Sequence, residues 1–318
     1  MELISIGSPA LWGGFILFVL AMLALDLGVF HRKAHEVRFK EAATWSGVWI
    51  SLALLFNLGL WHFFGAERAG EFLAGYLIEK SLSVDNIFVF VTIFGAFAVP
   101  AAVQHRVLFW GILGALVMRA VLIFAGAALV ASVHGVMYVF GALLIFTAVK
   151  LLRDMNKPPK DIKEGWFFRV FTRLIPTAPQ YDGGRFFTRV DGRHLATPLL
   201  LVLVLVELSD LVFAVDSIPA IFAVTSDPFI VFTSNIFAIL GLRSLYFLLA
   251  GMVDRFRYLK VGLAGILFFV GVKLLLNATL KIPIGLSLAI IAGMLAAAML
   301  ASVLRDRWKR SQAMAAPL

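Results

Sequence analysis

Glu207-Leu-Ser-Asp210-Leu-Val-Phe-Ala-Val-Asp216-Ser-Ile-Pro219 places three carboxylates, two hydroxyls and a proline inside an apolar run. An ionised carboxylate near the centre of a bilayer costs roughly 3 kcal/mol on insertion scales. Three acids so close together therefore indicate an ion or proton site in a membrane-spanning helix. The alternative is that salt bridges between helices neutralise them.

The composition of the whole chain agrees with a membrane protein. Of its 318 residues, 61% are hydrophobic and 15% are charged, and the mean hydropathy is +0.95. Soluble domains carry about 25% charged residues. Cysteine is absent, which excludes disulfides and a thiolate metal site. The net charge of +9 comes from basic residues in short loops, so it indicates membrane topology rather than a nucleic-acid partner.

The fold class predicted from these patterns is an all-α polytopic membrane protein with about nine transmembrane helices. A span needs about 20 apolar residues, and the runs of that kind fall near 11–30, 45–64, 72–98, 107–131, 133–152, 198–224, 228–250, 258–276 and 283–304. Loops rich in Lys and Arg alternate with poorly charged ones. The positive-inside rule then predicts a multi-pass inner-membrane protein with its N-terminus outside and its C-terminus in the cytoplasm.

An internal repeat organises the middle of the chain. Glu79-Lys-Ser-Leu-Ser-Val-Asp85-Asn-Ile resembles the stretch from Asp210 to Ile218, and the following spans carry Arg119 and Arg243. Three spans per copy place the copies in opposite orientations, as in many secondary transporters. The predicted units are 1–71 (spans one and two), 72–152 (repeat A, spans three to five), 153–197 (a cytoplasmic basic loop), 198–276 (repeat B, spans six to eight) and 277–318 (the last span and a tail).

The repeat also predicts geometry. Because the two copies are oppositely oriented, Glu79 is expected at the same depth in the membrane as Asp216, and Asp85 at the same depth as Asp210. These two depths differ by about 9 Å. Asp210 and Asp216 lie six positions apart on one helix, so they do not point along one line unless the helix is broken. Pro219 cannot donate a backbone hydrogen bond, and it would free a carbonyl near Asp216.

The chemistry near these acids is oxygen chemistry. Carboxylates, amides and hydroxyls suit hard or borderline cations such as Mg²⁺, Ca²⁺ and Mn²⁺, and acids of this kind also carry protons in pumps. The candidate metal ligands are Glu79, Asp85, Asn86, Glu207, Asp210, Asp216 and Ser217. No catalytic motif or phosphate loop is present in the sequence, so we expect neither an enzyme nor a bound organic cofactor.

Four other charged residues are candidates for charge pairing or gating: Asp26, Lys80, Arg119 and Arg243. The arginines can simply neutralise neighbouring acids. Lys80 can pair with Glu207 or another acid. Asp26 lies near the inner end of the first span, where it is either solvated at the interface or part of an entry gate.

The motifs resemble those of the TerC family of integral membrane proteins, and within it the Alx-like branch. The matching stretches are Leu25-Asp26-Leu27, 75–86, 196–200, 206–219 and 233–243. The resemblance covers nearly the whole chain. It implies a bacterial inner-membrane protein linked to manganese efflux and metal homeostasis, with Glu79, Asp85, Glu207, Asp210 and Asp216 handling the metal.

The function expected from residues and resemblance together is export of Mn²⁺ from the cytoplasm by a proton-coupled secondary transporter. Two alternatives stay open. One is a membrane partner that delivers metal to secreted proteins at the translocon, suggested by the 153–197 segment. The other is a Ca²⁺/H⁺ exchanger, because oxygen ligands do not separate the two ions. Besides the bilayer, a divalent cation and protons, the expected partners include the translocon or further copies of the chain.

Overall fold

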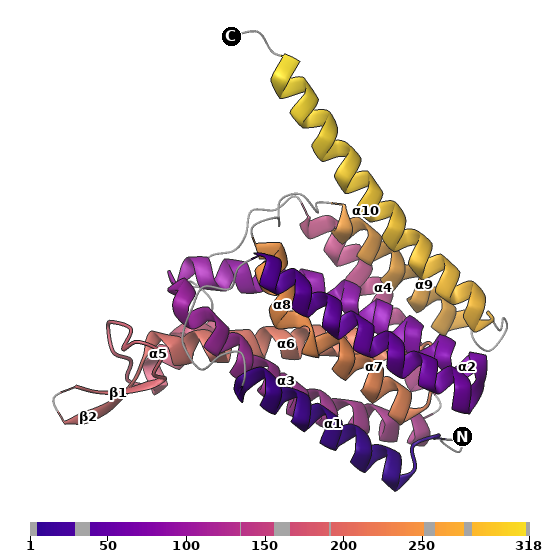
Figure 1. Cartoon of the computed structure of the whole chain (residues 1–318), viewed down its shortest axis with the longest axis horizontal. Coiled ribbons are helices and arrows are strands. Elements are labelled where there is room, and N and C mark those ends of the chain that lie inside the picture. The colour runs from indigo at the N-terminus through magenta and orange to yellow at the C-terminus, as the bar shows by residue number, and fades with distance from the viewer. Residues whose placement is uncertain are drawn as a thin grey trace.

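The computed structural model describes residues 5–28, 39–133, 135–155, 166–190, 192–250, 258–276 and 282–315. Apart from one small hairpin, the regular structure in these ranges is helical. Figure 1 shows a bundle of long helices with the hairpin at one end. The helices are α1 (Pro9–Gly28), α2 (Phe39–Ala96), α3 (Ala101–Ser132), α4 (Val136–Asp154), α5 (Trp166–Leu174), α6 (Pro198–Phe222), α7 (Pro228–Leu240), α8 (Leu242–Leu249), α9 (Leu259–Leu276) and α10 (Ile284–Ala315).

The membrane-crossing helices are recognised by length and hydropathy. Among the described residues, six helices meet both criteria, namely α2, α3, α4, α6, α9 and α10, and a seventh span results if the bent pair α7 and α8 counts as one. The chain is therefore an all-α polytopic membrane protein. The sequence predicts a larger number, about nine, because it also counts the segment of α1 and divides α2 into two spans.

Helix α2 reverses direction at Gly65. This residue has φ 89° and ψ 173°, a backbone conformation that only glycine adopts readily. Phe56 and Phe72 lie on either side of it, and their ring centroids are 5.2 Å apart. Sixteen residues of uninterrupted helix would separate them by about 24 Å. The two arms of α2, 39–64 and 66–96, therefore fold back on each other.

We expect Gly65→Ala to lower the free energy of unfolding by about 1–3 kcal/mol, because the side chain would force a strained backbone at the reversal. Thermal unfolding of the purified protein in detergent measures the loss. Gly59→Ala is the matched control, since Gly59 lies within the helical part of α2 and a methyl group there meets no atom within 4 Å. Equal melting temperatures for the two variants would contradict a requirement for glycine at the turn.

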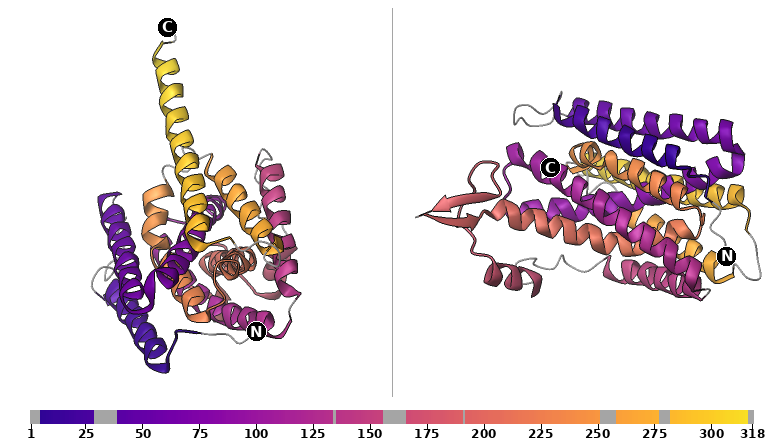
Figure 2. Two further views of the ribbon diagram at one scale, coloured as in Figure 1. Left: turned by 90° about the vertical axis from the view of Figure 1, so that its right-hand side faces the viewer. Right: turned by 90° about the horizontal axis from the view of Figure 1, so that it is seen from below.

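The centre of the bundle is formed by the second arm of α2 together with α3, α6 and α7. Glycines allow the closest approaches: a Cβ at Gly75 would lie 2.8 Å from the Ser234 hydroxyl of α7, and a Cβ at Gly111 of α3 would lie 3.1 Å from Val206 of α6. Viewed along α6, the helices α1 and the first arm of α2 lie on one side of this centre and α4 and α9 on the other (Figure 2). Other helices thus cover one face of the acidic stretch of α6, while Val212 and Val215 on its other face are exposed.

Helices α4 and α9 pack against each other backbone to backbone. A Cβ at Gly271 would lie 2.8 Å from the carbonyl oxygen of Gly141, and a Cβ at Gly141 would lie 3.0 Å from the carbonyl oxygen of Gly271. No side chain fits in such a contact without displacing the main chain. We refer to α4 and α9 below as the α4–α9 pair.

Helix α7 begins with a conventional cap and ends at a break. The Asp227 carboxylate accepts a hydrogen bond from the Phe229 amide at 2.9 Å, and Pro228 occupies the first helical position, where proline is favoured. The helix ends at Leu240, and α8 continues at an angle of 40°. Broken helices of this kind expose backbone carbonyls inside a membrane protein.

The connection before α6 contains a hairpin and the short helix α5. Strands β1 (Phe187–Val190) and β2 (Arg193–Ala196) pair antiparallel, and Gly192 in the turn has φ 76°, as tight hairpin turns require. The Tyr181 hydroxyl donates to the carbonyl of Phe97 at 2.7 Å. This contact attaches the connection to the end of α2.

Candidate functional site

A buried arginine joins two helices through their carboxylates. Arg119 of α3 and Glu79 of α2 have no exposed surface, and Asp210 of α6 is 2% exposed. The guanidinium donates two parallel hydrogen bonds to Asp210, from Nε to Oδ2 at 2.9 Å and from Nη2 to Oδ1 at 2.8 Å. Its Nη1 also forms an ion pair with Glu79 Oε1. Arg119 is thus the shared partner of both acids.

Amide and hydroxyl groups complete this cluster, which we call the Arg119 cluster. Asn235 of α7 donates from Nδ2 to Glu79 Oε2 at 3.1 Å, and Asn86 of α2 donates from Nδ2 to Asp210 Oδ1 at 3.3 Å. Arg119 Nη1 further donates to Ser217 Oγ at 3.4 Å and to Asn235 Oδ1 at 3.3 Å. Four helices therefore meet at one set of polar contacts.

The charges of the Arg119 cluster do not balance. Two carboxylates face one guanidinium, so the ionised cluster carries an excess negative charge. Two oxygens of α2 near it, Ser83 Oγ and Asn86 Oδ1, are buried and receive no hydrogen bond from any described residue. Buried polar atoms normally have a partner. Free acceptors beside excess negative charge favour an additional positively charged occupant.

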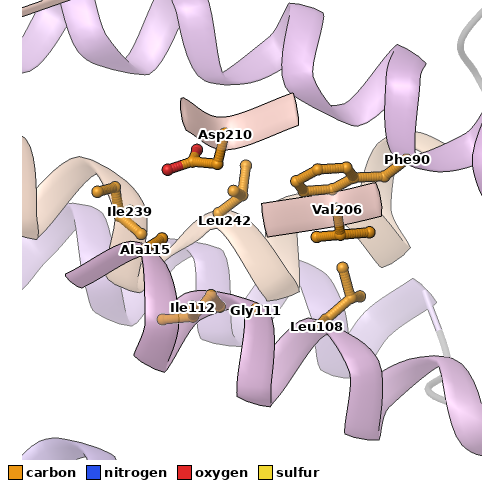
Figure 3. Close-up of a pocket in the computed structure, with 9 residues that line it drawn as sticks. All are labelled: Phe90, Leu108, Gly111, Ile112, Ala115, Val206, Asp210, Ile239 and Leu242. Carbon is orange, nitrogen blue, oxygen red and sulfur yellow. The ribbon is translucent and has the colours of Figure 1, made fainter. Parts of the chain in front are cut away.

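Asp210 also borders a small enclosed cavity with room for about one water molecule. Its walls come from α2, α3, α6, α7 and α8 and are otherwise apolar. Figure 3 shows Asp210 as the one charged side chain among the nine that line it. The cavity gives the carboxylate a neighbouring space that protein atoms do not fill.

Asp85 and Asp216 are the sequence neighbours of Asn86 and Ser217 at the two ends of the Arg119 cluster, but their own polar contacts are with other helices. Asp85 Oδ1 lies 3.6 Å from the Lys260 ammonium of α9. Asp216 accepts a hydrogen bond from the Thr147 hydroxyl of α4 at 2.9 Å. Both partners belong to the α4–α9 pair. Neither Thr147 nor Lys260 is among the residues that the sequence predicts for the site.

The depth-matched acids lie at the predicted levels, but within the described part of the chain neither pair makes a direct contact. Depth matching placed Glu79 opposite Asp216 and Asp85 opposite Asp210, whereas Glu79 and Asp210 meet instead through Arg119. The axial offset between α2 and α6 agrees with the assumed one, because Asn86, next to Asp85, donates to Asp210. In addition, a Cβ on Gly75, four positions before Glu79, would lie 3.1 Å from Ile221, five positions after Asp216.

The prediction that Asp210 and Asp216 point in different directions is confirmed. Helix α6 continues through Pro219 to Phe222, and the two aspartates contact different neighbouring helices.

Glu207 occupies a separate, half-buried position. A Cβ on Gly114 of α3 would lie 2.0 Å from Glu207 Oε1, so the carboxylate rests directly on the backbone of α3. None of the described residues donates a hydrogen bond to it. It precedes Asp210 by three positions, which places both on neighbouring parts of the α6 surface.

Lys80 does not pair with Glu207. Its ammonium donates to the carbonyl oxygen of Ala238 at 3.3 Å, near the end of α7. A Cβ on Gly241 would come within 2.8 Å of the same ammonium. A cation at the C-terminal end of a helix is favourable, so Lys80 stabilises the break between α7 and α8.

The remaining gating candidates are less informative. Arg243 is buried in α8 and lies outside the Arg119 cluster. The side chain of Asp26 lies outside the part of the chain that the structure describes. Within the described ranges, no three His, Cys, Asp or Glu side chains come close enough to hold a metal ion together. The seven candidate metal ligands are thus divided: Glu79, Asn86, Asp210 and Ser217 form one cluster, and Asp85, Glu207 and Asp216 stand apart.

Fold and site together define a multi-pass membrane protein with a charged, hydrogen-bonded cluster at the centre of its helix bundle. The model of the "Integral membrane protein TerC family" matches residues 64–310. The chain therefore belongs to the TerC family.

Bacterial relatives match over most of their length. An "Uncharacterized membrane protein STKORF319" of Myxococcus xanthus is 61% identical over 303 residues, covering 95% of each chain. The "Putative membrane-bound redox modulator Alx" of Escherichia coli K12 is 49% identical over 300 residues, covering 92% of this chain and 93% of the relative. An "Uncharacterized membrane protein" of Rickettsia bellii is 41% identical, covering 92% and 97%. No solved structure matches the chain.

Proposed function

We propose that the protein is a secondary transporter that exports Mn²⁺ from the cytoplasm in exchange for protons, through a cation site at the Arg119 cluster. The observation that carries this proposal is the pair of fully buried carboxylates, Glu79 and Asp210, that share one arginine. Buried charges in a membrane protein are costly and mark ion or proton paths. A purely structural pair would need only one acid for one base.

The contacts support an inverted repeat of two three-helix units within an arrangement of about nine spans. Glu79 and Asp210 occupy equivalent positions of the two copies, and they meet at one arginine. The second aspartates are arranged reciprocally: Asp85 of the first copy contacts α9 of the second, and Asp216 of the second contacts α4 of the first. A pseudo-twofold axis through the Arg119 cluster accounts for both relations, and substrate sites of such transporters lie at the interface between the copies.

In this proposal Arg119 is a tethered counter-ion. When no substrate is bound, its guanidinium holds Glu79 and Asp210 together and neutralises part of their charge. A divalent cation that enters supplies two charges, so it can replace the guanidinium at one carboxylate, with Asn86 and Ser83 as neutral oxygen ligands. After the cation has left, protons that bind to Glu79 and Asp210 neutralise their charge while the protein returns to its starting conformation. Glu207, the half-buried acid beside Asp210, is a relay for the ion or the proton.

The choice of Mn²⁺ follows from the donor set and from the relatives. Carboxylate, amide and hydroxyl oxygens favour Mg²⁺, Ca²⁺ and Mn²⁺ over softer metals. Several relatives are named as redox modulators. This chain has no cysteine, so a redox role here would not use thiols, and a redox-active cation such as Mn²⁺ is compatible with it. If the basic loops lie in the cytoplasm, the N-terminus is on the outer side of the inner membrane and the C-terminus is in the cytoplasm.

A second candidate function is delivery of metal to a partner protein at the membrane. The hairpin β1–β2 projects beyond the helix bundle (Figure 1) and carries exposed arginines such as Arg189 and Arg193. Flux measured in liposomes that contain only the purified protein separates the two functions. Metal movement without any partner supports a transporter.

The main experiment measures cellular manganese after a manganese load in a host that lacks its own exporters. We expect the wild type to lower the retained Mn²⁺, and we expect Glu79→Gln and Asp210→Asn each to lose about 10–100-fold in Mn²⁺ affinity or transport. Glu67→Gln is the control, because Glu67 is exposed near the α2 reversal. Unchanged manganese with the wild type would refute export. A parallel calcium load tests the exchanger alternative.

A further inference from the structure

The two aspartates outside the Arg119 cluster have a shared arrangement that the central site does not use. Along their helices, Asp85 and Asp216 each lie six residues, or about 9 Å, from the acid that reaches Arg119. Helices α2 and α6 run in opposite directions, so the two aspartates flank the cluster at opposite depths. Each therefore lies at the end of the cluster that faces one surface of the membrane, next to Asn86 or Ser217 in the sequence.

Both aspartates are held by one structural unit. Lys260 on α9 reaches Asp85, and Thr147 on α4 reaches Asp216. The α4–α9 pair is joined through the backbone contact of Gly141 and Gly271, so we expect the two helices to move together. A displacement of this pair relative to α2 and α6 changes both contacts.

The contact between Asp85 and Lys260 closes a small cavity beside Asp85. A small cavity with room for about one water molecule lies between α2 and α9 and is lined by Ser81, Asp85 and Lys260. The Lys260 ammonium also lies 4.9 Å from the centre of the Phe88 ring, which covers it from another side. Rupture of the Asp85–Lys260 pair would connect this cavity to the end of α9.

We propose that Asp85 and Asp216 are the entrance carboxylates of the cation path, each closed in this structure by the α4–α9 pair. Asp85 with Lys260 forms the gate on the side of the basic loops, and Asp216 with Thr147 forms the gate on the opposite side. When the pair moves, a freed aspartate receives or releases the cation on its way to the Arg119 cluster. This assignment rests on the proposed transport function and adds the positions of the two gates.

The absence of native cysteine makes the gates directly measurable. Ser81→Cys places one thiol in the cavity behind the Asp85 gate. Ala220→Cys places a second thiol one helical turn from Asp216. Ala220 is fully buried and packs in the same apolar cluster as Leu144 and Ala148 of α4. A hydrophilic maleimide then reports how often each gate opens. Each thiol is combined with Lys260→Met or Thr147→Val, which remove one gate contact at a time.

We expect a crossed pattern. Lys260→Met should raise the labelling rate of Ser81→Cys roughly fivefold, the population change that the loss of one polar contact produces, and it should leave Ala220→Cys unchanged. Thr147→Val should do the reverse. The conservative variants Lys260→Arg and Thr147→Ser should restore low labelling. A thiol at Ala53, which is buried in a different hydrophobic cluster together with Phe15 and Phe237, should stay protected in every variant.

Three results would overturn the proposal. They are equal labelling changes at both thiols, no change at either, or a simultaneous rise at Ala53→Cys, which would show that the variants only loosen the fold. Labelling is measured without metal, so it tests the gates independently of transport. If the crossed pattern is found but the wild type moves no Mn²⁺, the proposed function fails and the gates stand.

Discussion

Arg119→Met is expected to cause the largest loss of stability of any substitution considered for this chain. Removing one partner of a buried ion pair costs about 3–5 kcal/mol, because it leaves an uncompensated charge. Here one side chain serves two buried carboxylates, Glu79 and Asp210. We therefore expect little folded protein in the membrane and a strongly lowered melting temperature in detergent. Native-like yield of the variant would contradict a shared counter-ion.

The matched control removes the charges together. Combining Arg119→Met with Glu79→Gln and Asp210→Asn replaces all three charged groups by neutral groups of similar size, and this triple variant should recover most of the lost stability. Added Mn²⁺ should raise the melting temperature of the single variant, where two acids lack their counter-ion, and should not affect the triple variant. A metal effect of equal size in both would exclude the cluster as the binding site.

Gly271→Val is expected to separate the α4–α9 pair. Its side chain would enter a space where even a Cβ lies 2.8 Å from the Gly141 carbonyl oxygen and 3.2 Å from the Ile145 amide nitrogen. Backbone atoms do not move aside as side-chain ends do, so we expect a loss of about 1–3 kcal/mol or more. Thermal unfolding measures it.

The comparison for this substitution is Gly293→Val on α10, because a Cβ there meets no atom within 4 Å. If the α4–α9 pair also controls both entrance carboxylates, Gly271→Val should raise labelling at Ser81→Cys and Ala220→Cys together. Wild-type stability of Gly271→Val would show that the two helices are not held by this contact.

The buried acids and their partners illustrate what the sequence reveals. Carboxylates in apolar runs are visible because their burial is costly, so Glu79, Asp85 and Asp210 were identified as candidates without coordinates. The same holds for Arg119, a lone charge in an apolar helix. The composition and the 20-residue runs also predict the all-α membrane fold, since only that class buries so much apolar sequence.

The relative positions of the helices could not be predicted in the same way. How closely the helices approach depends on contacts such as Gly75 of α2 with Ser234 of α7 and Gly111 of α3 with Val206 of α6. These glycines resemble any others in the sequence. Depth matching predicts which levels face each other, but not that the long side chain of Arg119 reaches both levels and joins Glu79 to Asp210. Thr147 and Lys260 were missed because an ordinary threonine and a loop-end lysine carry no distinguishing pattern.

Helix α10 has a practical consequence for imaging the protein. It continues unbroken from Ile284 to Ala315, and Figure 1 shows its final turns extending well clear of the bundle. A small scaffold protein whose first helix is spliced in register onto these turns would be carried as a rigid handle. Such a fusion would provide a 34.9 kDa chain with the asymmetric mass that particle alignment in electron cryo-microscopy needs.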